Sequence, residues 1–173
     1  LGAPAPRTAD GRPELTGQWR GAGSRGELRD ATKPKAWARE GMALHESNYY
    51  RDGPHMQCLS QGLAYLTGGG GGGGNMRRVV QGPTVIAILN PDLTYRQIFI
   101  DGRTLEEDPL PIWQGYSVGR WDGDTLVVES NGYNAKTWLH AEGLQHTEQL
   151  RITERWRRAD FGHMQVEITY NDP

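Results

Sequence analysis

A single cysteine, Cys58, is present in the sequence, so no disulfide can form within the chain. No run of eighteen apolar residues occurs either, and the sequence therefore predicts no membrane-spanning helix. Neither sign of charge is in large excess, because 19 Lys and Arg stand against 21 Asp and Glu and give a net charge of -2. Without a global basic field, the protein is not expected to bind nucleic acid.

Short catalytic motifs are also missing from the sequence. It has no P-loop, no glycine fingerprint for dinucleotides after a strand, and no Gly-x-Ser-x-Gly turn. It has neither a His-Glu-x-x-His pattern nor a pair of closely spaced cysteines for zinc. Because most of these chemistries need such a motif, we expect no catalytic residue, no metal ligand set and no cofactor.

Turn-forming residues and large aromatics are abundant instead. The 173 residues include 24 Gly, 10 Pro, six Trp and seven Tyr, and 36% of them are hydrophobic. Helical proteins avoid this much glycine and proline, whereas turn-rich β proteins use both freely. The composition and length favour one β domain with a lean core and an extended arm.

The N-terminal region shows neither a helical nor a strand period and is rich in Gly and Pro. We therefore predict an extended arm over residues 1–45 and an antiparallel β-barrel domain over residues 46–173. Within the arm, residues 15–19 suggest one short strand and residues 35–42 one helical turn. The chain begins with Leu, which suggests that a signal peptide or anchor has been removed, or that the start is missing.

Aromatic and basic residues of the arm are candidates for partner binding. Residues 1–40 carry eight Lys and Arg against five Asp and Glu, a charge that suits docking to an acidic surface. A solvated irregular segment explains the same charges. Bulky aromatics in an aperiodic segment are expected to plug into the body or into a partner. The predicted partner-binding residues are Trp19, Trp37, Arg20 and Arg25.

Seven consecutive glycines occupy positions 68–74. They represent either a flexible loop or positions where glycine stands for side chains that were not identified. No function is assigned to this stretch.

From residue 79 onward, apolar and polar residues alternate as in β-strands. The run at 85–89 is apolar throughout and predicts a buried strand. Asp122-Gly123 between two strand-like runs predicts a type I′ hairpin. Three consecutive hairpins are expected, and long loops are expected at 101–115 and 131–147. The predicted hairpins join 79–89 to 95–100, 116–121 to 124–130, and 150–157 to 164–170.

In the last hairpin, one face of the first strand carries Leu150, Ile152 and Trp156, with Glu154 as the exception. Apolar residues of the second strand form a matching stripe. Such a meander must cover its apolar face by curling into a barrel or by stacking a second sheet. We predict an all-β fold with a closed or partly open, lipocalin-like barrel, and a two-sheet sandwich is the alternative. The stripe consists of Met164, Val166, Ile168 and Tyr170.

Several polar residues have a functional and a structural interpretation. His140 and His146 share a loop with two glutamates and could ligate a metal, but exposed loop residues that make ordinary hydrogen bonds are the favoured explanation. Acids near Asp101 could act as an acid–base pair, or Asp101 could simply pair with Arg103 in a turn. The arginines of 151–158 could face an acidic partner or form cross-strand ion pairs on a solvated face. The tryptophans from Trp113 onward could line a ligand pocket or form the core, and Cys58 is expected to be a buried thiol.

The chain contains WQGYSVGRWDGDTLVVE at 113–129, YRQIF followed by DGR at 95–103, TERW at 153–156 and DFGH at 160–163, and it opens with PRTADGRP at 6–13 and LTG at 15–17. Together these segments resemble the sequences of a group of exported bacterial proteins of unknown function. The resemblance covers most of the chain and departs from the group's pattern at residues 59–78. It implies a signal peptide and a periplasmic or secreted location, and it implies no activity.

These observations favour a non-catalytic interaction or structural protein, such as an extrinsic periplasmic accessory subunit of a larger membrane-bound complex. Protein partners, and possible attachment at the membrane surface through them, follow from this hypothesis. Two alternatives stay open. One is a lipocalin-like carrier of a small apolar ligand, and the other is a metal-assisted hydrolase using the loop of His140 and His146.

Overall fold

The computed structural model describes residues 2–21, 33–62, 76–140 and 142–173, so Arg25 and the glycine run at 68–74 lie outside the described residues. The eight strands belong to one sheet, in which each strand neighbours the next in sequence. The elements are β1 (Gly17–Arg20), α2 (Ala36–Ser47), the 3-10 helix η1 (Pro54–Gln57), β2 (Met76–Gln81), β3 (Val85–Leu89), β4 (Tyr95–Phe99), β5 (Tyr116–Asp122), β6 (Thr125–Asn131), β7 (Arg151–Arg158) and β8 (Met164–Asn171).

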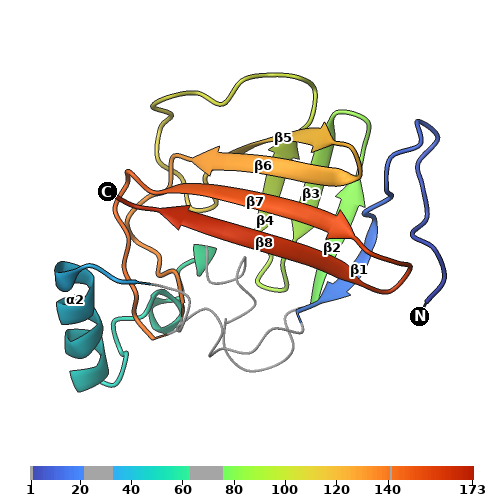
Figure 1. Cartoon of the computed structure of the whole chain (residues 1–173). Coiled ribbons are helices and arrows are strands. Elements are labelled where there is room, and N and C mark those ends of the chain that lie inside the picture. The colour runs from blue at the N-terminus through green and yellow to red at the C-terminus, as the bar shows by residue number, and fades with distance from the viewer. Residues whose placement is uncertain (1, 22–32, 63–75, 141) are drawn as a thin grey trace.

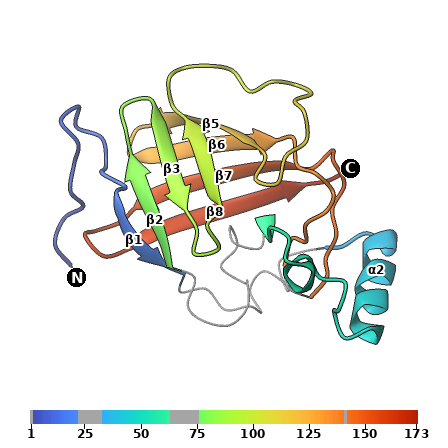
Figure 2. The same cartoon turned by 180° about the vertical axis from the view of Figure 1, so that it is seen from behind.

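The sheet curls into a half-barrel, which confirms the predicted all-β fold and its partly open barrel. Strands β1–β4 form one side and cross behind β6–β8, which form the other (Figure 1). Figure 2 shows the same sheet from behind, with β2 and β3 nearest the viewer. The two sides enclose one interior, as in a barrel whose first and last strands do not meet.

One pairing departs from the predicted antiparallel meander. β4 and β5 run parallel and are joined by a single residue pair, Phe99 and Val118, whereas all the other neighbours are antiparallel. A tight hairpin can join only antiparallel strands, but the long connection 100–115 is free to carry the chain back along the sheet. The sheet is therefore mixed, and β1–β4 and β5–β8 form two halves that meet at this pairing.

The Asp-Gly hairpin forms, shifted by one residue from the prediction. Asp122 and Thr125 pair, so the two-residue loop is Gly123-Asp124. Gly123 has a φ of +57°, while Asp124 keeps a negative φ. A type I′ turn needs positive φ at both positions, so the predicted turn type was wrong.

The inner face of the half-barrel holds two apolar core clusters. In the last hairpin, Leu150, Ile152 and Trp156 are buried, as the alternation predicted. The first cluster contains Leu15, Val79, Ile86, Ile88, Ile98, Leu126, Val128 and Trp156. The second contains Ala38, Tyr133, Leu139, Leu144, Leu150 and Ile152.

The segment predicted to be an extended arm contributes to the fold. Leu15 is fully buried in the first core cluster, and β1 pairs with β2 as the first strand of the sheet. The helical turn predicted at 35–42 is the start of α2, which buries Ala38 and His45. The boundary drawn after residue 45 thus falls within this helix. In the part of the chain that the structure describes, no helix has the length and apolar character needed to cross a membrane.

Candidate functional site

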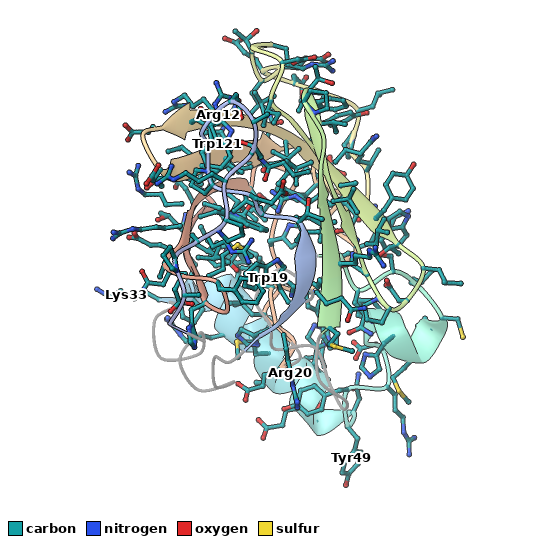
Figure 3. The ribbon with its side chains drawn as sticks, turned by 90° about the vertical axis from the view of Figure 1, so that its right-hand side faces the viewer. Arg12, Trp19, Arg20, Lys33, Tyr49 and Trp121 are labelled. Atoms are coloured by element: carbon teal, nitrogen blue, oxygen red, sulfur yellow. The ribbon has the colours of Figure 1, made fainter. Side chains whose placement is uncertain are left out.

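Trp19 is directed into the interior of its own chain. It packs against the first core cluster, and its Nε1 donates a hydrogen bond to the Leu15 carbonyl oxygen at 2.9 Å. The Arg158 guanidinium lies 4.9 Å from the centre of its ring. Figure 3 shows Trp19 on the inner side of β1 and Arg20 extending away from it. Trp19 therefore plugs into the body, because the register of β1 turns position 19 inward together with Arg77.

The other residues predicted to bind a partner are at the surface where the structure describes them. Arg20 is exposed on the outer side of β1 and pairs in register with Met76 of β2. Trp37 on α2 is 40% exposed and lines a groove of about 410 Å³ that also borders Tyr170 of β8. β1 and α2 lie at opposite sides of the molecule (Figures 1 and 2), so these two residues do not form one site.

His140 and His146 are both buried, so the expectation of exposed loop residues was wrong. His146 Nδ1 donates to the Thr147 carbonyl oxygen at 2.9 Å, which leaves its Nε2 to accept from Thr137 Oγ1 at 2.9 Å. Burial holds the pKa of His146 below its ordinary value. Among the described residues, no three His, Cys, Asp or Glu side chains come close enough to hold a metal ion. The histidines are buried because the connection that carries them supplies part of the second core cluster.

The arginines of β7 divide between the two faces of the sheet. Arg155 lies opposite Glu167 on the outer face, as predicted, and its side chain pairs with Asp122 of β5 at 3.4 Å. Arg158 instead follows Trp156 on the inner face and is only 8% exposed. Its guanidinium donates to backbone carbonyl oxygens of the N-terminal segment and of the β7–β8 turn. The prediction of a solvated face was therefore wrong for Arg158, since strand alternation turns it inward.

The structure tests the predictions made for Asp101 and for Cys58. Asp101 pairs with Arg103 at 2.7 Å, which confirms the turn interpretation, and Arg103 lies over the ring of Phe99 at 3.8 Å. The hydrogen bonds that Asp101 accepts from Arg103 hold the pKa of Asp101 below its ordinary value.

Cys58 is exposed, so the prediction of a buried thiol was wrong. It ends the short helix η1 in a left-handed conformation, which places it on a surface turn.

Between the two apolar clusters, the inner face carries polar side chains that we name the interior polar cluster. Arg96 and Glu154 form an ion pair at 2.5 Å, and each side chain is only 1% exposed. Arg96 also donates to the hydroxyls of Ser117 at 3.0 Å and Ser130 at 2.9 Å. The ion pair links the two halves of the sheet, since Arg96 is on β4 and Glu154 on β7. The members of the cluster are Arg96, Ser117, Ser130, Tyr133, Glu154 and Tyr170.

Two tyrosines complete the interior polar cluster. Burial raises the pKa of Tyr133 to about 12, and burial, with the nearby Glu154, raises that of Tyr170 well above its ordinary value. Both phenols therefore stay protonated near neutral pH. The Tyr133 hydroxyl is close to Ser130 but outside hydrogen-bonding geometry. The cluster as a whole is electrically neutral, because its only charged members are one arginine and one glutamate.

The outer side of β2–β4 is mostly apolar, with Gln97 and Arg78 as its polar positions, and we call its apolar part the outer apolar face. Its exposed members are Val80 (41%), Leu89 (43%) and Tyr95 (61%), with Leu93 (95%) at the tip of the β3–β4 hairpin. Leu89 and Tyr95 lie side by side in the register. In Figure 2 the ribbons of β2 and β3 are in front, and no other described segment crosses them. The face consists of Val80, Val85, Ala87, Leu89, Leu93, Tyr95 and Phe99.

The charged residues at the outward positions of β1–β4 are all basic. Arg78 pairs in register with Leu89 and therefore points outward next to it. Arg20 and Gln18 follow on the outer side of β1, beside Met76 and Arg78. The outward positions of β1–β4 thus carry two arginines and no acidic residue. Arg103, which covers Phe99, adds a third arginine, but this one is paired with Asp101.

Sequence reasoning missed this face, although a signal for it exists. The run 85–89 is apolar at five consecutive positions, as in strands covered on both faces. The structure buries only Ile86 and Ile88, and Leu89 stays 43% exposed. The predicted buried strand is therefore covered on its inner side alone. The signal that could have identified this surface is a strand that is apolar on both faces in a sheet that is covered on one side only.

Comparisons with family models, curated proteins and solved structures give no match to this chain.

Proposed function

We propose that this protein is a non-catalytic interaction protein that binds a protein partner through the outer apolar face. The observation that carries the proposal is β3, whose two faces are both apolar while only one is covered. Contiguous exposed apolar side chains are costly in water, and larger patches of this kind mark interaction sites. Tyr95 is also of a residue type that is enriched at the centres of interfaces.

The charges indicate what kind of partner fits. Arg20 and Arg78 lie on one side of the apolar residues, and no acidic residue accompanies them on the outward positions of β1–β4. A partner surface with an apolar centre and an acidic margin would complement this arrangement. Arg20, predicted as a partner-binding residue, would lie at the margin of the interface rather than at its centre.

The cellular setting of the proposal is an extrinsic periplasmic accessory subunit of a larger membrane-bound complex. It is supported by the resemblance to exported bacterial proteins. Only 36% of the residues are hydrophobic, which is consistent with a chain that buries part of its surface only on assembly. In this setting the partner that carries the acidic margin would belong to the membrane-bound complex.

The test begins with the full chain purified gently from its source membranes and measured by native mass spectrometry. We expect a stoichiometric assembly with a defined partner. The purified partner is then titrated with the wild-type chain and with a Leu89→Ser/Tyr95→Ser variant. We expect the variant to bind at least about tenfold more weakly, because both side chains would be buried at the interface.

A matched variant on the other half of the sheet serves as the control. Thr153→Ser and Arg157→Gln change exposed outward positions of β7 and should leave affinity unchanged. Recovery of the chain as a free monomer would contradict the proposal, and so would equal binding by the two double variants. Truncation of residues 1–45 is not a suitable test, since Leu15 and Trp19 are part of the core.

A second candidate function, binding of a small apolar ligand, is favoured by the groove beside α2. Its volume of about 410 Å³ is in the range of small-molecule pockets, and its lining includes Trp37, Leu139, Leu144 and Tyr170. This groove differs from the barrel interior lined by tryptophans that the sequence suggested. Saturable quenching of tryptophan fluorescence by an apolar ligand, lost in Trp37→Phe, would support it, and an unchanged spectrum would exclude it.

A further inference from the structure

The interior polar cluster contains more hydrogen-bonding capacity than its own members use. Arg96 Nη1, Glu154 Oε1 and the hydroxyls of Tyr133 and Tyr170 are all inaccessible to solvent, and none has a hydrogen-bond partner among the described residues. Arg96 and Glu154 use their other polar atoms fully in the ion pair and in the bonds to the two serines. Native proteins rarely leave one such atom unpaired, and here four belong to one cluster.

The four atoms define the chemistry of a guest. Arg96 Nη1 is a donor, Glu154 Oε1 is an acceptor, and the protonated phenols of Tyr133 and Tyr170 donate or accept. A carboxylate or phosphate would meet the unpaired oxygen of Glu154, and a cation would meet the guanidinium of Arg96. A neutral O–H group can accept from Arg96 and from one tyrosine while it donates to Glu154, so it matches the charge and the hydrogen-bonding character of the cluster.

We propose that the interior polar cluster is a binding site for a buried hydroxyl group. The group belongs to an internal water or to the alcohol end of a small ligand. Internal waters that satisfy buried polar groups are regular parts of folded proteins. A ligand could reach the cluster from the groove beside α2, because Tyr170 lines that groove and its hydroxyl is buried. The site is separate from the outer apolar face and does not depend on the proposed function.

Thermal unfolding of the full chain with Tyr133→Phe and Tyr170→Phe tests the proposal. If a guest satisfies the hydroxyls, each variant loses hydrogen bonds to it, and the unfolding midpoint falls by on the order of 2–4 °C. If the hydroxyls are unpaired, their removal relieves a desolvation cost and the midpoint rises. Tyr49→Phe is the control, since Tyr49 is 80% exposed and should leave the midpoint unchanged.

A high-resolution crystal structure of the wild-type chain provides the second measurement. We expect density within hydrogen-bonding distance of Arg96 Nη1 and Glu154 Oε1. An isolated peak would identify water, whereas continuous density and a matching mass released on denaturation would identify a ligand alcohol. Midpoints that are unchanged or raised in both phenylalanine variants would overturn the proposal, and so would an empty cluster in the map.

Discussion

The two halves of the sheet, β1–β4 and β5–β8, share one interior, but their outer faces differ in chemical character. On β2–β4 the outward side chains are mostly apolar, with Val80, Leu89 and Tyr95 exposed. On β5–β8 the outward side chains form ion pairs, such as Arg120 with Glu129 at 2.5 Å and Arg155 with Asp122 at 3.4 Å. The outer surface of β5–β8 is typical of a solvated antiparallel sheet, whereas the outer surface of β2–β4 is apolar and exposed.

Both halves contribute their inner faces to the core. The interior is completed by packing and by the Arg96–Glu154 ion pair, which joins β4 of one half to β7 of the other. The outer faces are then free to differ: one half carries exposed ion pairs, and the other carries the apolar residues through which we propose that the protein binds a partner. The following predictions test this division, in order of decreasing effect.

The largest effect is expected where the two halves join. Arg96→Met leaves the charge of Glu154 buried without a partner and should lower the free energy of unfolding by about 3–5 kcal/mol. Urea unfolding measures the change. Arg120→Met, which breaks an exposed ion pair on the outer face of β5, is the matched control and should cost about 0–1 kcal/mol. Equal losses in the two variants would show that the interior pair does not hold the halves together.

Substitutions at two neighbouring residues of β3 compare how much the inner and the outer face contribute to stability. Ile88 is 1% exposed, so Ile88→Ala should destabilise the free protein by about 2–5 kcal/mol. Leu89 is 43% exposed, and Leu89→Ala should change stability by only about 0.5 kcal/mol. Chemical denaturation of both variants measures the contrast. A large loss in Leu89→Ala would mean that the outer apolar face is already covered within the chain.

A pH effect of smaller size is expected from His146, which is buried in the connection between β6 and β7. Burial depresses the pKa of His146 in the folded state, whereas the unfolded side chain titrates near its ordinary value of about 6.5. Below that pH the unfolded state binds more protons, so stability falls as the pH is lowered from about 6.5 toward the folded pKa. Denaturation at several pH values should show this loss.

A pair of histidine variants isolates the effect. His146→Gln should weaken the decline in stability below about pH 6.5, because the variant has no imidazole to protonate at this position. His163→Gln removes a histidine whose side chain is 63% exposed and should keep the decline. If both variants behave like the wild type, another buried group is responsible for the pH dependence.

The smallest effect is expected on the charged outer face. Arg155→Gln breaks the pair with Asp122, whose side chains are 47% and 70% exposed, and should cost no more than about 1 kcal/mol. The cost should shrink further in 1 M salt, where the screening length is about 3 Å. Urea unfolding at low and high salt measures it. A loss that persists at high salt would indicate packing by the arginine stem instead.

Local pattern was enough to predict much of the fold. The alternation in β7 and β8 assigned Leu150, Ile152 and Trp156 to the inner face, and burial confirms it. In β4, side-chain alternation places Arg96 on one face with Ile98, which is the face that the structure buries. The parallel pairing of β4 with β5 was not predicted, because the direction of a strand after a long loop depends on contacts far away in sequence.

The candidate sites depended even more on tertiary structure. Trp19 and Arg20 were predicted together as partner-binding residues, yet neighbouring positions of a strand point to opposite faces. Trp19 therefore joined the core, and Arg20 joined the margin of the outer apolar face. Strand β2 was not predicted as a separate element, so Arg78 and Val80 could not be placed beside Leu89 before the register was known.

By itself, the sequence determined that the protein is rich in β-strands, has no internal disulfide, and divides its last two strands into an apolar and a polar face. Side-chain alternation is a local property, so it defines two faces wherever a strand forms. Only the tertiary structure decided which apolar face of β3 is covered, and which charged residues are buried in pairs. Both depend on how the sheet curls, since burial is a property of surfaces brought together from distant parts of the chain.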